Sequence, residues 1–150
     1  EINSFLGLIK IKSSTIKFNL PTGEIIVSET IGRIQQDLFI IQAELAGAPK
    51  TIAEEKVKWL EEIIDGIEKT LPPIKTFFVS GGTELATLSD IARTIARRAE
   101  RRVIGVVDEG KIKIGKNTLA YLNRLSSVLY AFARNFNHLA NIKEEAPQYK

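Results

Sequence analysis

The sequence predicts an all-α protein, an up-and-down bundle of about five helices in which residues 1–150 form a single domain. A chain of 150 residues suits one hydrophobic core. Apolar residues recur every three or four positions over long segments, as on one face of a helix. Proline and glycine separate these segments at short intervals. Hydrophobic residues make up 44% and charged residues 26%, the balance of an ordinary soluble globular protein.

The N-terminal part is expected to hold one helix followed by a short hairpin or loop insertion. Residues 1–11 place their large apolar side chains on one helical face. The segment 13–27 contains the turn-forming stretch Pro21–Gly23. Short alternating runs on each side of this turn, Thr15–Phe18 and Glu24–Val27, are predicted to pair as a small hairpin.

Two further helices follow from spacing and capping signals. The first is predicted to start at an N-cap on Ser28 and to end near Gly47, with apolar residues spaced by three and four between them. The second is predicted to start at Thr51, with Glu54 completing a capping box, and to stop before Pro72.

The C-terminal half predicts two long helices. Residues 74–82 form a connector, a helix covers about 84–107, and the last helix covers roughly 116–141, where a 3-4-3-4 apolar spacing continues without a break. The polar tail after Lys143 is expected to fray.

Composition excludes several classes of protein and site. There is no cysteine, so disulfides and thiolate chemistry are excluded, and His138 is the single histidine, so a multi-histidine metal site is excluded. No apolar run is long enough to span a bilayer and no secretory signal is visible, which predicts a cytoplasmic protein. The net charge of +3 suits an anionic ligand without demanding a nucleic acid. Because the chain opens at Glu1 and contains no Met, we expect some sequence to precede it.

A charged edge runs along the predicted helix 84–107. At about 100° per residue, Arg93, Arg97 and Glu100 fall within about 60° of one another. Guanidinium forks suit phosphate oxygens, and Glu100 could orient them or accept from a ribose hydroxyl or an adenine amine. Two other readings stay open: a solvated face with internal Arg–Glu pairs, and nucleic-acid binding. An apolar arc lies roughly opposite and comprises Leu88, Ile95, Ala99 and Val103.

Two other segments carry polar features. The glycine pair at the end of Phe77–Gly82 permits either a helix N-terminus open to an anion or a simple helix-entry turn, and its two phenylalanines are typical of a core. The polar residues of the last helix are binding residues or partly buried hydrogen-bonding groups. They are Asn123, Ser127, Tyr130 and Arg134, beside the leucine stripe.

Together these segments resemble one family, the ATP:cob(I)alamin adenosyltransferases. Phe77–Gly82 with the residues that follow, Ala92–Arg102 and Tyr121–Ser126 are similar to the family's three core motifs. Glu1–Gly7 resembles the end of its N-terminal Asp-Glu-Leu-Asn segment, and Ile34–Phe39 resembles part of its second helix. The resemblance spans most of the chain in the family's order.

The resemblance implies a trimeric five-helix bundle with ATP at each subunit interface. Such an enzyme transfers the 5′-deoxyadenosyl group of ATP to the Co(I) of a reduced corrinoid, forming adenosylcobalamin and releasing triphosphate. ATP, Mg²⁺ and cobalamin are then the expected ligands, with neither a nucleic acid nor a membrane as partner. The alternative is a non-catalytic nucleotide-binding module that kept the fold, and a basic RNA-binding bundle is a more distant one.

The resemblance also assigns roles to individual residues. Arg93 matches an arginine that pairs with an aspartate across the interface, and Phe77 matches an aromatic residue that displaces the lower axial ligand of the corrinoid. The implied catalytic residues are Arg93 and Arg97, the implied ATP-binding residues are Arg97, Arg98, Glu100, Arg101 and Asn123, and the implied corrinoid-binding residues are Phe77 and Ser127. No residue is assigned to bind a metal.

The sequence departs from the family pattern at three places. The glycine-rich ATP loop expected near the N-terminus, with the aspartate expected just before Glu1, is not among these residues. Ser80 stands where the family usually has proline. Ser127 stands where it often has aspartate, which removes a carboxylate from the corrinoid side of the implied site.

Overall fold

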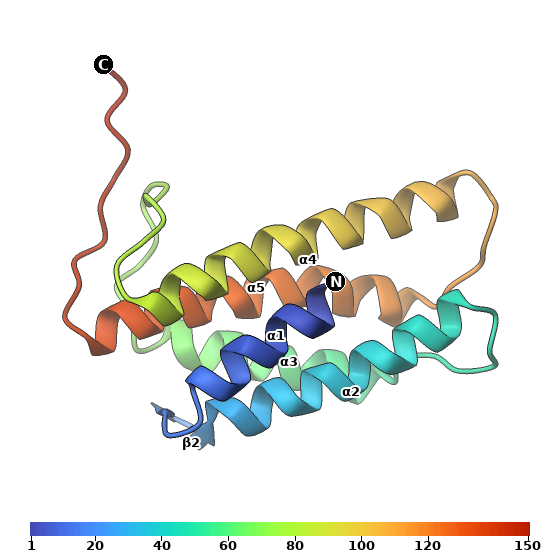
Figure 1. Ribbon diagram of the computed structural model, residues 1–150, viewed down its shortest axis with the longest axis horizontal. Helices are drawn as coiled ribbons and strands as arrows, with labels where there is room; N and C mark the ends of the chain where they lie inside the picture. The colour runs from blue at the N-terminus through green and yellow to red at the C-terminus, as the bar shows by residue number, and fades with distance from the viewer.

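A computed structural model describes residues 1–150 as five helices that alternate in direction, with a two-stranded hairpin at one end (Figure 1). No helix combines the length and the apolar character needed to cross a membrane. The elements are α1 (Ile2–Lys12), β1 (Lys17–Leu20), β2 (Gly23–Ile26), α2 (Val27–Leu45), α3 (Glu54–Glu68), α4 (Glu84–Asp108) and α5 (Lys116–Leu139). The predicted all-α bundle of five helices is confirmed.

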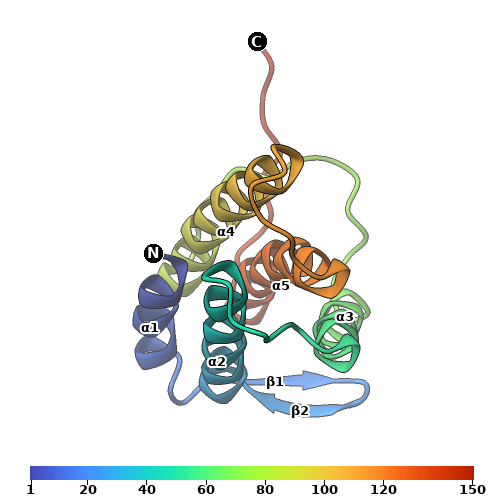
Figure 2. The same ribbon diagram turned by 90° about the vertical axis from the view of Figure 1, so that its right-hand side faces the viewer.

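Helix α5 occupies the middle of the bundle. It packs against both α3 and α4, while α1 packs against α2 and α4 (Figure 2). The unbroken apolar spacing of α5 explains this position, because a helix contacted from several sides needs a broad apolar surface. Its Tyr121, Leu125, Leu129 and Phe132 are all buried. Groups that α5 carries on its flanks are therefore held by the most buried helix of the bundle.

The predicted hairpin is confirmed, although its first strand starts two residues later than expected. Lys17 pairs with Ile26 and Leu20 with Gly23 in an antiparallel register. Phe18 is fully buried and lies edge-to-face against Phe132, with ring centroids 5.4 Å apart. This aromatic contact fixes the hairpin against the end of α5.

Two predicted helix caps are wrong. Helix α2 begins at Val27, because β2 runs directly into it, and Ser28 lies inside the first turn. Helix α3 begins at Glu54 with Ala53 at the N-cap position. The hydroxyl of Thr51 lies 3.4 Å from that of Thr118 on α5 instead. A tertiary hydroxyl contact has replaced the local capping bond expected from the sequence.

The face that α4 turns to the core differs from the predicted one. Its buried residues include Ala92, Ala96 and Glu100, each four positions after the last, whereas Leu88 and Ile95 of the apolar arc are only partly buried. Small side chains on this stripe let α4 approach α5 closely. Glu100 is consequently buried, so the alternative of a solvated face does not hold for this residue.

The tail after α5 leaves the end of the bundle and extends away from it on the side of the segment that precedes α4 (Figure 1). The backbone N–H of Val79 donates to the carbonyl of Glu145 at 2.8 Å, and Glu144 forms an ion pair with Arg134 on α5. The expectation that the whole tail frays is therefore wrong at Glu144 and Glu145. Their contacts join the tail to the segment between α3 and α4, residues 69–83, here called the connector.

Candidate functional site

Glu100 of α4 is the centre of a small polar network between α4 and α5. Its side chain is 5% exposed. One carboxylate oxygen accepts from Arg97 Nη1 at 3.2 Å, and the other accepts from Asn123 Nδ2 at 2.9 Å. Asn123 Oδ1 in turn accepts from Arg124 Nη1 at 3.0 Å. The buried carboxylate therefore orients Arg97, and the structure brings together these three residues implied by the resemblance.

Arginines line an open groove along the outer side of α4, here called the arginine groove. Arg97 is 49% exposed and uses one donor on Glu100, which leaves its other guanidinium donors facing this groove. The lining residues are Arg93, Thr94, Arg97, Arg98, Arg101 and Arg102. All of them belong to α4, and none is hydrophobic. The groove suits the oxygens of a polyphosphate, but a single helix supplies only one wall.

Arg93 and Arg98 point to partners other than Glu100. Arg93 Nε donates to Asp90 Oδ1 at 2.7 Å, and its guanidinium carbon lies 5.9 Å from the centre of the Tyr130 ring. Burial raises the pKa of Tyr130 above its ordinary value. Arg98 forms an ion pair with Glu1 at the start of the chain. Arg93 therefore joins the arginine groove to the surface around Tyr130.

A second concavity adjoins Arg93 beneath the connector and is here called the Phe77 hollow. It has a volume of about 860 Å³, within the range of small-molecule sites. Phe77 lies on its wall with 77% of its surface exposed, so the prediction of a core position is wrong for this residue. The other lining residues are Ile74, Lys75, Thr76, Phe78, Ser80, Asp90, Arg93, Tyr130 and Tyr149.

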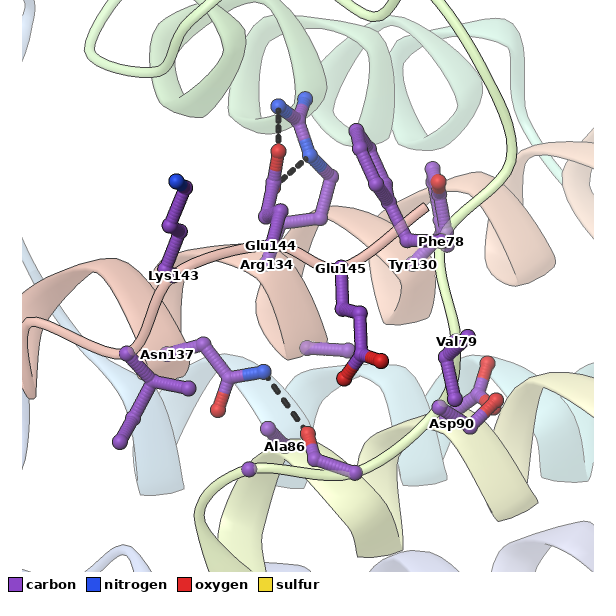
Figure 3. A pocket seen from close by; sticks show the side chains of 15 residues that line it. Phe78, Val79, Ala86, Asp90, Tyr130, Arg134, Asn137, Lys143, Glu144 and Glu145 are labelled. Carbon is purple, nitrogen blue, oxygen red and sulfur yellow. Dashed lines mark hydrogen bonds and ion pairs between the residues drawn. The ribbon is translucent and has the colours of Figure 1, made fainter. Parts of the chain in front are cut away.

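The glycine pair forms a helix-entry turn that is already satisfied. Gly81 and Gly82 have φ values of +135° and +97°, which glycine adopts without strain. Asn137 of α5 donates to the carbonyl of Gly81 at 2.8 Å (Figure 3). Asn137 also accepts from the N–H of Thr83 at 2.9 Å. The Thr83 hydroxyl accepts from the N–H of Ala86 at 3.1 Å. These bonds fit the interpretation as a helix-entry turn.

Ser127 lies apart from Phe77. It lines a shallow depression between α3 and α5 together with Glu61 and Arg124, and Arg124 Nε donates to Glu61 at 3.0 Å. The implied corrinoid-binding residues therefore line two separate depressions of the chain. His138 is exposed near the end of α5.

The sequence analysis assigned no role to two acidic groups, Asp37, which is buried, and Glu44, which is partly buried. Asp37 of α2 accepts from the hydroxyl of Tyr121 at 3.0 Å and pairs with Lys56. Glu44 accepts from the N–H of Gly115 at 2.7 Å and from the hydroxyl of Thr118. The available signal was the position of Asp37 within an apolar stripe, where an acidic residue needs a partner. No group of three or more acidic, histidine or cysteine side chains is placed to hold a metal ion.

Comparison with known proteins agrees with the site. The sequence profile of the family described as cobalamin adenosyltransferase matches residues 1–136. This chain belongs to that family. The predicted family, fold and enzyme class are therefore confirmed.

Relatives and solved structures show how far the likeness extends. A corrinoid adenosyltransferase of Bacillus subtilis is 38% identical over 95% of this chain and 72% of its own length. The corrinoid adenosyltransferase PduO of Citrobacter freundii is 38% identical over 75% of this chain, but the match covers only 35% of that protein. A variant of the PduO-type ATP:corrinoid adenosyltransferase of Lactobacillus reuteri, complexed with cobalamin and ATP, superimposes with a TM-score of 0.82 at 32% identity. The superposition covers 98% of this chain and 78% of that one.

Proposed function

We propose that this chain transfers the 5′-deoxyadenosyl group of ATP to the Co(I) of a reduced corrinoid. The observation that carries the proposal is the placement of the arginine groove beside the Phe77 hollow, with Arg93 lining both. A polyphosphate in the groove and a large flat ligand at the hollow would then meet at α4. The Lactobacillus reuteri neighbour is complexed with both cobalamin and ATP.

The chemistry asks for positioning and charge stabilisation. The Co(I) electron pair attacks the 5′ carbon of ATP, a cobalt–carbon bond forms, the carbon–oxygen bond breaks, and triphosphate leaves while cobalt becomes Co(III). The protein supplies no nucleophile, so the absence of cysteine is no obstacle. Arg97 and Arg93 are proposed to stabilise the charge that builds on the triphosphate. Arg98, Glu100, Arg101 and Asn123 are proposed to complete the ATP site.

Phe77 is proposed to lie against the corrinoid face and to disfavour a lower axial ligand. Its exposure supports this role, because an uncovered aromatic side chain is free to contact a ligand. The variants in the neighbour structures change a phenylalanine and an arginine that are 20 positions apart, and Phe77 and Arg97 have the same separation. Ser127 is proposed to contact the corrinoid from a different side.

Mg²⁺ would have to be held mainly by the substrate. The chain offers no cluster of carboxylates for a cation, and both oxygens of Glu100 are occupied by Arg97 and Asn123. Mg²⁺ commonly binds the phosphates of a nucleotide with few protein ligands. We propose that it arrives with ATP, and we assign no residue of this chain to it.

We also propose a homotrimer with its ATP sites between subunits. The arginine groove has one wall in this chain, so a second surface is needed to enclose a nucleotide. A cytoplasmic location is proposed as well, since ATP and a strongly reduced corrinoid are both required.

The direct test mixes the protein with ATP, Mg²⁺ and chemically reduced cobalamin and follows the visible spectrum. Growth of the adenosylcobalamin bands is expected. ATP binding without spectral change would contradict transfer and favour a nucleotide-binding module. Salt-sensitive RNA binding with neither would contradict both.

A Phe77→Ala variant tests the corrinoid side alone. Because Phe77 is exposed, the free energy of unfolding should change by less than about 0.5 kcal/mol. We expect a strong loss of adenosylcobalamin formation from a Co(II) substrate under mild reduction, with a much smaller loss from preformed Co(I). Equal rates of the variant and the wild type on the Co(II) substrate would overturn the role of Phe77.

A further inference from the structure

Arg134 of α5 is a buried guanidinium that none of the roles above uses. Its side chain is 5% exposed, although arginine is rarely buried unless it is paired. Its Nε donates to Glu144 Oε1 at 2.6 Å, and its Nη2 donates to Glu144 Oε2 at 3.2 Å and to the carbonyl of Pro72 at 2.8 Å (Figure 3 shows the pair with Glu144). Its guanidinium carbon lies 5.3 Å from the centre of the Phe78 ring. One side chain therefore binds α5, the tail and the connector together.

The connector needs such an anchor because most of it has no regular structure. Between α3 and α4 its backbone forms no helix or strand, and Phe77 itself is too exposed to be fixed by packing. The position of Phe77 thus depends on the anchors on each side of it. Arg134 holds the Pro72 carbonyl before Phe77 and contacts Phe78 just after it.

Leu71 is buried in the core at the start of the connector, and the other long-range hydrogen bonds of the connector lie beyond Phe78. Val79 donates to the tail at Glu145, and the tail is itself fastened through the Arg134–Glu144 pair. Asn137 holds the Gly81 carbonyl at the far end. Of the hydrogen bonds before Phe77, the bond from Arg134 is the one that ties the connector to the central helix. Without the guanidinium, the residues before Phe77 would lose their hydrogen bond to α5. The tail that accepts from Val79 would also be held less firmly.

We propose that Arg134 is a positioning residue for the corrinoid: through Pro72, Phe78 and Glu144 it fixes where Phe77 is presented. This inference rests on the proposed function. It predicts a selective effect, because the Arg97–Glu100–Asn123 network shares no hydrogen bond with Arg134. Corrinoid binding should suffer while ATP binding is preserved.

The first experiment replaces Glu144 by Gln, which removes the charge of the pair but leaves Arg134 an acceptor. Glu62→Gln is the matched control, because Glu62 is exposed on α3 and forms no ion pair. Arg134→Lys and Arg134→Met follow, and the lysine variant keeps the charge but lacks the planar fork. If Arg134→Met fails to fold, Glu144→Gln still decides the question, since the tail lies outside the helices.

Two readouts separate positioning from a merely structural role. We expect kcat/KM for cobalamin to fall about tenfold in Glu144→Gln and further in Arg134→Met, with KM for ATP within about twofold of wild type. The spectrum of bound Co(II)alamin should show less of the species that lacks a lower ligand. Amide hydrogen exchange without any ligand should quicken at Val79, whose N–H donates to the tail at Glu145.

Several results would overturn the inference. Faster exchange at Val79 with unchanged cobalamin kinetics and spectrum would make Arg134 structural only. Unchanged exchange in both Arg134 variants and in Glu144→Gln would show that it anchors nothing. If wild-type protein forms no adenosylcobalamin and binds no corrinoid, the proposed function itself fails, whereas an active wild type with normal variants removes this inference alone.

Discussion

Two buried carboxylates, Asp37 and Glu100, occupy comparable positions against α5 but differ in what surrounds them. Asp37 is 1% exposed and Glu100 is 5% exposed. Each uses both oxygens: Asp37 on Lys56 and the Tyr121 hydroxyl, Glu100 on Arg97 and Asn123. In both networks, one cation and one neutral hydrogen-bond donor compensate the negative charge of a buried carboxylate.

The two networks differ in how exposed the partner side chains of the carboxylates are. Tyr121 is fully buried, and burial together with the charge of Asp37 raises its pKa above the ordinary value. Lys56 is 29% exposed, so this network lies mostly inside the bundle. Arg97 is half-exposed and opens onto the arginine groove. A buried carboxylate stabilises the fold when its partners are enclosed, and it prepares a ligand site when its cation still has donors facing solvent.

Breaking the enclosed network should have the largest effect. Asp37→Ala leaves Lys56 and the Tyr121 hydroxyl without their acceptor, so we expect the free energy of unfolding to fall by about 3 kcal/mol. Urea unfolding measures it. ATP KM should stay near the wild-type value at temperatures where the variant remains folded. A stable Asp37→Ala protein with weakened ATP binding would reverse the assignment of the two carboxylates.

Arg97→Gln should show the opposite pattern, with a small change in stability and a large loss of activity. It removes a half-exposed guanidinium, so stability should change by no more than about 1 kcal/mol. Adenosyl transfer should lose about a hundredfold in kcat/KM, the scale of one lost charge-stabilising donor. Lys113→Gln, an exposed loop residue with the same change of charge, is the control in the spectral assay. Equal activity of the two variants would contradict the role of Arg97.

Glu100→Gln should give a smaller, mixed effect. The amide keeps the size of the side chain and one acceptor, but it holds Arg97 without charge assistance. We expect KM for ATP to rise about tenfold, with a loss of stability smaller than that of Asp37→Ala. Isothermal titration with ATP measures the loss of ATP affinity, and urea unfolding of the same sample measures the loss of stability. Unaltered ATP affinity would show that Arg97 needs no orientation from Glu100.

The smallest effect concerns pH. Because the pKa of Tyr121 is raised in the folded state, the folded protein keeps that proton above pH 10 while the unfolded chain loses it. Its contribution to stability is thus present below pH 10 and declines as the pH rises further. Tyr121→Phe should cost about 1 kcal/mol at pH 8, and its deficit should shrink between pH 10 and 11 in urea unfolding curves. A constant deficit would argue against the shift.

Periodicity was sufficient for the helices but not for their orientation. The unbroken apolar spacing of α5 predicted a long helix, but its place in the middle of the bundle was found only in the structure. On α4 the same reasoning placed the larger side chains opposite the charged edge, whereas Ala92 and Ala96 face the core. Close packing against α5 favoured small residues over large ones, and no single-helix pattern reveals that choice.

In the candidate site, too, some residues could be named from the sequence, whereas other contacts were visible only in the structure. The resemblance named Arg97, Glu100 and Asn123, and the structure brings them into contact. The partners of Arg134 could not be found from the sequence, because Pro72 and Glu144 lie 62 and 10 positions away in segments without periodicity. The contact of Asn137 with Gly81 could not be predicted for the same reason, because the two residues lie 56 positions apart.

The sequence by itself determined five amphipathic helices, one hairpin, a mild positive charge and the motifs of a corrinoid adenosyltransferase. These are local or compositional properties, so they survive without knowledge of packing. Only the tertiary structure decided that Glu100 is buried, that Phe77 is exposed and that the tail is tied to the connector through Arg134. Each of these depends on which surfaces meet across the bundle, and that is set by the sum of contacts over the whole chain.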